Sequence, residues 1–136
     1  MQLTYNNQTP LAGGCFEPND SGVSRFGYAV IEEMNRLGMI VDLSHAGRQT
    51  CLDAISFSSK PVAISHANPQ FFHKSIRNID DEVLKNLAKK DGFIGLSLYP
   101  LHLKNHQRLV LHHDDSEHNV LLGLVEHLCN TYMFCQ

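Results

Sequence analysis

The sequence predicts an α/β fold in which about three parallel strands alternate with four helices. Two observations carry this prediction. Short, continuous apolar runs, such as those that end at His45 and His66, are typical of strands buried on both faces of a sheet. Segments with apolar residues at helical spacing lie between these runs, and such alternation indicates a parallel sheet covered by helices. No internal repeat and no glycine-rich phosphate loop is present, so the nucleotide-binding versions of this pattern lack their fingerprint.

Composition is that of one ordinary globular domain, which we assign to residues 1–136. Hydrophobic residues make up 43% and charged residues 18% of the 136 residues, which argues against disorder. The formal net charge is −3 without a block of Lys and Arg, so a nucleic-acid partner has no electrostatic support. No apolar run is long enough for a membrane span, and the first residues do not resemble a signal peptide. A cytoplasmic location is therefore expected, with the four cysteines as reduced thiols.

The first part of the chain predicts a loop, a helix and a strand. Residues 1–23 are rich in Asn, Gly and Pro and are expected to form the loop. A helix is expected to begin after Ser24, a good N-cap residue, and to end at Gly38. Its apolar residues recur at helical spacing: Phe26, Ala29, Val30, Met34 and Leu37. The following run, residues 39–45, is apolar and β-branched and predicts a buried strand.

The middle of the chain continues the alternation. The segment GRQTCLDAISFSS predicts a second helix whose apolar side comprises Cys51, Leu52, Ala54 and Ile55. Residues 61–66 predict a strand, and residues 67–78 a longer loop. The third helix has clear signals at both ends. Acidic residues precede its apolar stripe and basic residues end it, which complements the helix dipole. The acidic residues are Asp80, Asp81 and Glu82, and the basic residues are Lys89 and Lys90. That stripe is Val83, Leu84 and Leu87, and residues 93–98 predict the third strand.

The last part of the chain is expected to diverge from the core of β/α units, which we place at residues 24–105. Residues 102–113 are rich in histidine and are expected to form a loop, and residues 116–129 predict a fourth helix within the C-terminal segment 106–136. The histidines here could bind metal adventitiously, but they show no HExxH arrangement, so a solvated loop is the simpler interpretation: His102, His106, His112, His113 and His118.

Two histidines, His45 and His66, follow two of the predicted strands in the same Ser-His context. They are one β-α-β step apart, so both rings are expected at the carboxyl edge of adjacent parallel strands, where parallel α/β folds place their chemistry. Two imidazoles that converge there form half of a catalytic zinc site. Hydrogen-bonded loop histidines without a ligand remain the alternative, and spacing alone does not decide between the two.

Long blocks of the sequence resemble the membrane (renal) dipeptidase family of zinc metallopeptidases. These blocks are LTYNNQTPLA, FGYAVIEEMNRLGMIVDLSHAG, PVAISHANP and RNIDDEVLKNLAKKDGFIGLSLYP, and together they cover about residues 1–105. The resemblance implies a TIM (β/α) barrel of the amidohydrolase type, a two-zinc centre, a dipeptide substrate and a possible homodimer. It implies that His45 and His66 are metal ligands.

Three further positions carry over from the resemblance. Arg77 is similar to the residue that holds the substrate carboxylate, a role that suits a planar guanidinium, although a solvated loop arginine is the alternative. Tyr99 is expected to line the substrate pocket or to pack in the interior. Tyr5 stands where the mammalian enzymes have a substrate-contacting histidine, and a phenol cannot replace an imidazole near neutral pH. Asp42 belongs to a matching block, but nothing in the sequence assigns it a role.

The chain is interpreted as an internal fragment of such an enzyme, because several expected parts have no counterpart in it. The H-x-D ligands, the bridging Glu and a later Asp ligand of the family are absent from the sequence, and a TIM barrel typically needs about 250 residues. We therefore expect a partial barrel with no catalytic residue of its own, weak metal binding and little hydrolysis by the chain alone. A non-catalytic paralogue that acts as a binding or assembly module is the alternative.

Overall fold

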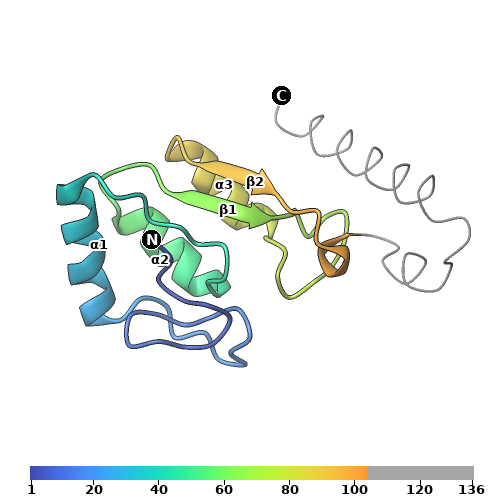
Figure 1. Cartoon of the computed structure of the whole chain (residues 1–136), viewed down its shortest axis with the longest axis horizontal. Helices are drawn as coiled ribbons and strands as arrows, with labels where there is room; N and C mark the ends of the chain where they lie inside the picture. Colours follow the sequence, from blue (N-terminus) through green and yellow to red (C-terminus); the bar gives the residue numbers. More distant parts are fainter. Residues whose placement is uncertain (104–136) are drawn as a thin grey trace, which may run out of the picture.

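The computed structural model describes residues 1–103 as a mixed α/β unit (Figure 1). The elements follow in the order α1 (Arg25–Leu37), α2 (Arg48–Phe57), β1 (Ala63–Ala67), α3 (Asp81–Lys89), β2 (Phe93–Leu96) and a 3-10 turn, η1 (Pro100–His102). The predicted fourth helix, 116–129, and the histidines from His106 onward lie outside the described residues. In residues 1–103 no helix is long and apolar enough to cross a membrane.

Helix α1 begins and ends where the sequence predicts, but it buries a different face. The Ser24 side chain accepts a hydrogen bond from the Gly27 amide, and Gly38 closes the helix with a left-handed φ of 71°. The predicted stripe is wrong at both ends, because Phe26 is 60% and Leu37 is 55% exposed. The buried side consists of Gly27, Ile31 and Met34. Gly27 belongs to it because its Cα passes close to the Leu11 carbonyl oxygen, where a Cβ would lie at 2.1 Å.

Helix α2 is capped by a residue from the N-terminal loop. Its own N-cap residue is Gly47, which offers no side chain. The Asp20 carboxylate takes that role and accepts hydrogen bonds from the amides of Gln49 at 2.5 Å and Thr50 at 3.1 Å, and from the Thr50 hydroxyl at 2.9 Å. These are the N–H groups that a helix start leaves without partners. Asp20 therefore joins the loop of residues 1–23 to α2.

Replacing Asp20 by alanine is expected to lower the free energy of unfolding by about 1–2 kcal/mol, because the first turn of α2 loses its acceptor. Urea unfolding followed by circular dichroism measures this change. Glu32→Ala, on the exposed side of α1, is the control and is expected to shift stability by no more than about 0.5 kcal/mol. Equal unfolding midpoints for the two variants would contradict the capping role.

The sheet is parallel, and the first predicted strand, residues 39–45, joins it only through an isolated bridge. Strands β1 and β2 pair in parallel, with Ala63 opposite Phe93 and Ile64 opposite Ile94. Residues 39–45 are not a strand; isolated parallel bridges link Asp42 to Ala63 of β1 and to Gln2. Hydrogen bonds from the Leu43 amide to the Ala63 carbonyl and from the Ala63 amide to the Val41 carbonyl hold this segment beside β1. It turns away at residues 44–45, so the ladder ends before a strand forms.

Helix α2 contacts both α1 and α3, and α1 lies on the side of α2 away from the strands (Figure 1). Helix α3 follows the prediction, with the Asp80 side chain accepting from the amides of Glu82 and Val83. The core contains apolar residues of the sheet segments and of all three helices, among them Ile31, Leu43, Ala54, Ile64, Val83 and Leu87. The described part therefore confirms an α/β fold with a parallel sheet, and it contains two strands rather than three and no closed barrel.

Candidate metal centre

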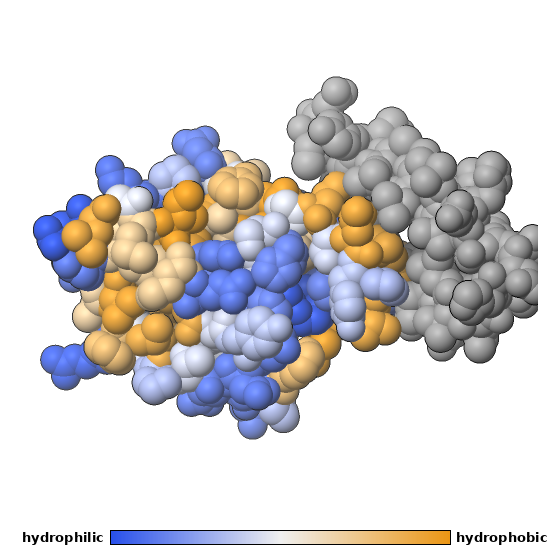
Figure 2. All heavy atoms as spheres, in the orientation of Figure 1, coloured by the Kyte–Doolittle hydropathy of each residue, from blue (hydrophilic) through white to orange (hydrophobic). Residues whose placement is uncertain are grey.

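The two predicted histidines meet at the carboxyl end of β1. His45 lies in the turn after the segment beside β1, and His66 is the fourth residue of β1. Their Nε2 atoms are 2.8 Å apart, and the ring planes are inclined by 61°. Figure 2 shows hydrophilic residues gathered in the middle of this face, over the end of β1, with hydrophobic residues on either side. The expected convergence of His45 and His66 is thus present.

His45 is held from the side opposite to His66. Its Nδ1 atom donates a hydrogen bond to the Oδ1 atom of Asn6 at 2.7 Å, which leaves Nε2 with its lone pair. The residue is only 7% exposed. Burial, followed by the nearby charges of Arg77 and His66, lowers the pKa of His45 to about 4. The ring is therefore neutral near pH 7, which is the state that binds metal.

His66 is held by a hydroxyl–carboxylate cluster that consists of Asp42, Ser44 and Ser65. The Nδ1 atom of His66 is 2.9 Å from the Ser65 hydroxyl, and its backbone amide donates to the Ser44 hydroxyl at 3.1 Å. Both hydroxyls lie 2.6 Å from the Asp42 carboxylate. Burial raises the pKa of Asp42, but hydrogen bonds from Ser44 and Ser65 outweigh it and lower the pKa to about 2. Asp42 is thus a carboxylate in this cluster.

His45 and His66 are suitable zinc ligands, and together they supply two of the ligands that a zinc ion needs. Imidazole nitrogen is a common zinc ligand, and each ring has its Nδ1 engaged so that Nε2 faces the shared position. At 2.8 Å the lone pairs of the two Nε2 atoms repel each other, and a metal ion bound to both nitrogens, or a proton on one of them, relieves this repulsion. Within residues 1–103 no group of three or more His, Cys, Asp or Glu side chains is placed to hold a metal ion. The described residues therefore supply two ligands.

Tyr5 lies on the His45 ring, so the structure brings this predicted residue to the site. The two rings are stacked, with centroids 4.2 Å apart and planes inclined by 23°. Tyr5 is 69% exposed, so it covers one face of His45 while its phenol stays accessible. Stacking of this kind limits rotation of the imidazole and shields it from water.

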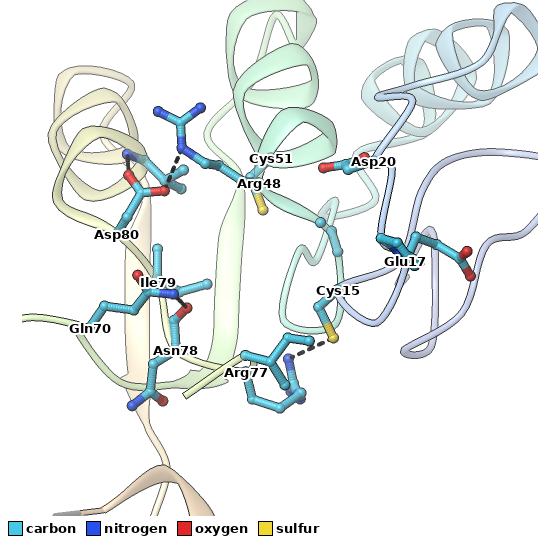
Figure 3. A pocket seen from close by; sticks show the side chains of 16 residues that line it. Cys15, Glu17, Asp20, Arg48, Cys51, Gln70, Arg77, Asn78, Ile79 and Asp80 are labelled. Carbon is cyan, nitrogen blue, oxygen red and sulfur yellow. Dashed lines mark hydrogen bonds and ion pairs between the residues drawn. The ribbon is translucent and has the colours of Figure 1, made fainter. Parts of the chain in front are cut away.

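Arg77 is buried beside the histidine pair rather than solvated. It is 8% exposed and donates from Nη1 to the Ser44 carbonyl, while Nη1 also lies 3.9 Å from the Cys15 thiol. Figure 3 shows the Arg77 guanidinium and Cys15 facing each other in a pocket of about 320 Å³. The Nη2 atom is buried and has no hydrogen-bond partner among residues 1–103. A buried donor without a partner is costly, so this position favours an acceptor from a ligand.

Tyr99 and His102 lie together after β2, and His102 corrects the expectation of a solvated loop. Tyr99 is 57% exposed, so it is not an interior packing residue, and its ring centroid is 5.2 Å from that of His102. His102 is 4% exposed, and its Nδ1 atom is 2.8 Å from the Ser97 hydroxyl. Its carbonyl accepts hydrogen bonds from the side chains of Asn68 and Asn78. His102 therefore ties the end of β1 to the segment after β2.

Stability is expected to fall as the pH decreases from 7 to 4, because His102 is neutral in the fold. Burial, then the nearby charges of Arg77, His66 and His73, lowers its pKa from 6.5 to about 4. Below pH 6.5 the unfolded chain binds the proton first, so this contribution is complete above that pH and is lost as the pH approaches 4. Between pH 7 and pH 5 the loss is on the order of 1–2 kcal/mol.

Urea midpoints of the metal-free protein at several pH values measure this effect. His45 contributes with the same sign, because its pKa is also lowered to about 4. The variant His102→Asn keeps a polar group near Ser97 without a titrating ring, and its midpoint is expected to depend less steeply on pH than that of the wild type. Identical pH profiles for the two proteins would contradict the assignment.

Several residues of the site carry no signal in the sequence. Asn6 and Ser65 each hold the Nδ1 atom of a histidine, yet Asn6 lies in a loop 39 positions before His45. Asp42 belongs to a block that resembles the family, and the sequence alone assigns it no role. The usable signal in the sequence is the repeated Ser-His pair. The Ser65 hydroxyl contacts the ring of the next residue, His66, and the Ser44 hydroxyl accepts a hydrogen bond from the His66 backbone amide.

Comparisons with known proteins agree with this geometry. The family profile described as Membrane dipeptidase (Peptidase family M19) matches residues 1–129. The Dipeptidase aclJ of Aspergillus oryzae is 40% identical over 84 residues, which are 62% of this chain and 20% of that protein. The chain thus spans about a fifth of the length of this curated relative.

Solved structures show the same likeness. An amidohydrolase from Pseudomonas aeruginosa matches with a TM-score of 0.70 and 42% identity, covering 74% of this chain and 31% of that one. A metallo peptidase from Rhodobacter sphaeroides, liganded with a phosphinate mimic of the dipeptide L-Ala-D-Ala, matches with a TM-score of 0.77. At 22% identity over 96% of this chain and 37% of that one, the second likeness shows the fold alone.

Proposed function

Since the chain belongs to the membrane dipeptidase family, Peptidase family M19, we propose that it contributes a zinc-binding half-site to the hydrolysis of dipeptides. The observation that carries this proposal is the pair of Nε2 atoms of His45 and His66, which face each other at 2.8 Å. Family membership supports a peptide-bond hydrolase as the class of enzyme. The dipeptidase names of the family and of the Aspergillus oryzae relative support a dipeptide as the class of substrate.

We assign His45 and His66 to one of the two zinc ions of a two-metal centre. Bound zinc polarises a carbonyl oxygen and lowers the pKa of water, which is the chemistry that peptide-bond hydrolysis needs. The chain's own residues orient the ligands: Asn6 and Ser65 fix the Nδ1 sides of the two rings, and Tyr5 covers one face of His45. Further zinc ligands are not among residues 1–103.

We assign Arg77 to the free carboxylate of the dipeptide, with Tyr5 and Tyr99 at the edge of the substrate site. The guanidinium is buried beside the Ser44 carbonyl, one residue from His45, so it lies next to the metal ligands. Its Nη2 atom still lacks an acceptor within residues 1–103, and a carboxylate is the acceptor that a guanidinium binds most strongly. A carboxylate requirement close to the metal would restrict cleavage to short peptides.

The test is zinc binding together with dipeptide hydrolysis by the purified chain. Zinc is titrated into wild-type protein and into the double variant His45→Ala/His66→Ala, and both are assayed with L-Ala-D-Ala. We expect the wild type to bind zinc weakly, to show little hydrolysis, and to lose both properties in the double variant. Zinc binding that is unchanged in the double variant would overturn the proposal, because the ion would then be bound elsewhere in the chain.

A further inference from the structure

We propose that Asp42, acting through Ser65, is a positioning residue that keeps His66 in the tautomer able to bind metal through Nε2. The inference deepens the proposed function, because it rests on His66 as a zinc ligand. It adds a role for a residue to which the sequence assigned none. Asp42 touches neither histidine ring in the hydrogen-bond network, and its nearest partners there are Ser44 and Ser65.

The argument starts from a count of hydrogens in the cluster of Asp42, Ser44 and Ser65. Each serine hydroxyl has one hydrogen, and an ionised carboxylate can only accept. The Ser44 hydroxyl lies 2.6 Å from Oδ1 of Asp42, and the Ser65 hydroxyl lies 2.6 Å from Oδ2. The two hydroxyl oxygens are also 2.9 Å from each other. The shorter distances to Asp42 are those of strong O–H···O⁻ hydrogen bonds, so both hydroxyl hydrogens point at Asp42.

The direction of the next hydrogen bond then follows. With its hydrogen committed to Asp42, the Ser65 oxygen can only accept from the Nδ1 atom of His66, 2.9 Å away. His66 therefore carries its proton on Nδ1 and keeps the lone pair on Nε2, the atom that faces His45. His45 is held less strictly, because its acceptor is the neutral side chain of Asn6, which can also donate when its amide turns over.

The Asp42→Asn variant should reverse this direction without disturbing the backbone. Oδ1 of Asp42 accepts from the amides of Ser44 and Ser65 and from the Ser44 hydroxyl, so the oxygen of an asparagine would stay at that position. Its Nδ2 would then face the Ser65 hydroxyl and donate to it. The Ser65 hydrogen is released to donate to Nδ1 of His66, and the ring proton moves to Nε2, where it blocks metal binding.

The reversed state is a folded one, which makes the variant informative. A proton on Nε2 of His66 can be donated to the lone pair of His45 across the 2.8 Å between them. In the metal-free wild type the two Nε2 lone pairs face each other, and in the metal-free variant a hydrogen bond takes their place. We therefore expect the variant to unfold at a urea concentration no lower than that of the wild type. Its zinc affinity is expected to fall about 10–100-fold, as outer-shell substitutions do.

The experiment reads the tautomer directly, in metal-free protein labelled with ¹⁵N-histidine. Two-bond ¹H–¹⁵N correlation spectra separate a pyridine-like from a pyrrole-like ring nitrogen, and the His66 signals are assigned with a His66→Asn variant. In the wild type the His66 Nε2 is expected to be pyridine-like, and in Asp42→Asn pyrrole-like. Ser65→Ala is the second variant; it removes the acceptor, so a mixture of the two tautomers is expected.

Asp81→Asn is the matched control, because it makes the same chemical change on the exposed first turn of α3. It is expected to leave both the tautomer and the zinc affinity unchanged. A pyridine-like Nε2 of His66 in Asp42→Asn, with zinc affinity within about twofold of the wild type, would overturn the inference. Failure of the wild type to bind zinc would instead contradict the proposed function, and the tautomers of the metal-free proteins would still decide the role of Asp42.

Discussion

Replacing His66 by alanine is expected to lower the affinity of the chain for zinc by more than about 100-fold, beyond the usual cost of losing an outer-shell partner. Within residues 1–103 only His45 would then remain at the site. A single imidazole on a protein surface binds zinc weakly, because the metal keeps most of its water. Isothermal titration with zinc, in competition with a chelator of known affinity, measures the change.

His73→Ala is the control for this experiment. His73 lies in the loop between β1 and α3 and is similar in chemistry to His66, but it does not belong to the histidine pair. Its loss is expected to leave zinc affinity unchanged. If His66→Ala and His73→Ala weaken zinc binding to the same extent, zinc is bound by scattered histidines rather than at the end of β1.

Arg77→Lys is expected to weaken the binding of dipeptides that carry a free carboxylate by about 10–100-fold, the value of one or two charge-assisted hydrogen bonds. Lysine keeps the charge but loses the planar fork that presents two donors to a carboxylate. In the structure one end of this fork donates to the Ser44 carbonyl while Nη2 has no partner within residues 1–103. A lysine ammonium cannot reproduce the geometry in which the guanidinium donates to the Ser44 carbonyl and to a carboxylate at the same time. Binding to the zinc-loaded protein is measured by titration calorimetry.

Two controls separate carboxylate recognition from a general loss of structure. A dipeptide amide, which lacks the carboxylate, is expected to bind poorly to the wild type and equally poorly to Arg77→Lys. Arg48→Lys alters an arginine that is paired with Asp80 and Glu82 on the opposite side of the same pocket, and it is expected to leave dipeptide binding unchanged (Figure 3). Equal loss for the dipeptide and its amide would contradict the proposed role of Arg77.

The helices could be predicted from the sequence because their signals are local. Ser24 and Gly38 bound α1, and Asp80 starts α3, each through contacts within one turn of the helix. The buried face of α1 could not be predicted in the same way. Gly27 faces the interior because the backbone at Leu11 passes close to it, and that approach depends on the tertiary structure.

The predicted strand at residues 39–45 shows the opposite case. Its apolar, β-branched composition predicts burial correctly at Val41 and Leu43, which are at most 1% exposed, but not at Met39 and Ile40, which are 43% and 54% exposed. Strand formation also requires a continuous ladder, and here the backbone turns at residues 44–45 to bring His45 into the site. Composition cannot separate a buried strand from a buried segment that pairs at one point.

The metal ligands of the candidate site could be predicted from the sequence, but the residues that hydrogen-bond to these ligands could not. His45 and His66 follow apolar runs at one β-α-β interval, and this places both at one edge of any parallel sheet. The partners of their Nδ1 atoms, Asn6 and Ser65, depend on side-chain hydrogen bonds that leave no periodicity in the sequence. The burial of His102 cannot be predicted for a related reason, because its neighbours in the sequence are typical of a polar loop.

The register of the sheet has a consequence for which mutations the site can accept. The ladder between β1 and β2 is irregular between Ile64 and Ala67, and there the Cα atom of Gly95 passes so close to the Ser65 carbonyl that a Cβ would lie 2.2 Å from its oxygen. Any side chain at Gly95 would push β2 away from the residues that hold His66. The architecture of the centre therefore depends on a position that has no chemical function at all. A search for variants with altered metal preference should keep this glycine fixed and vary the surface around it.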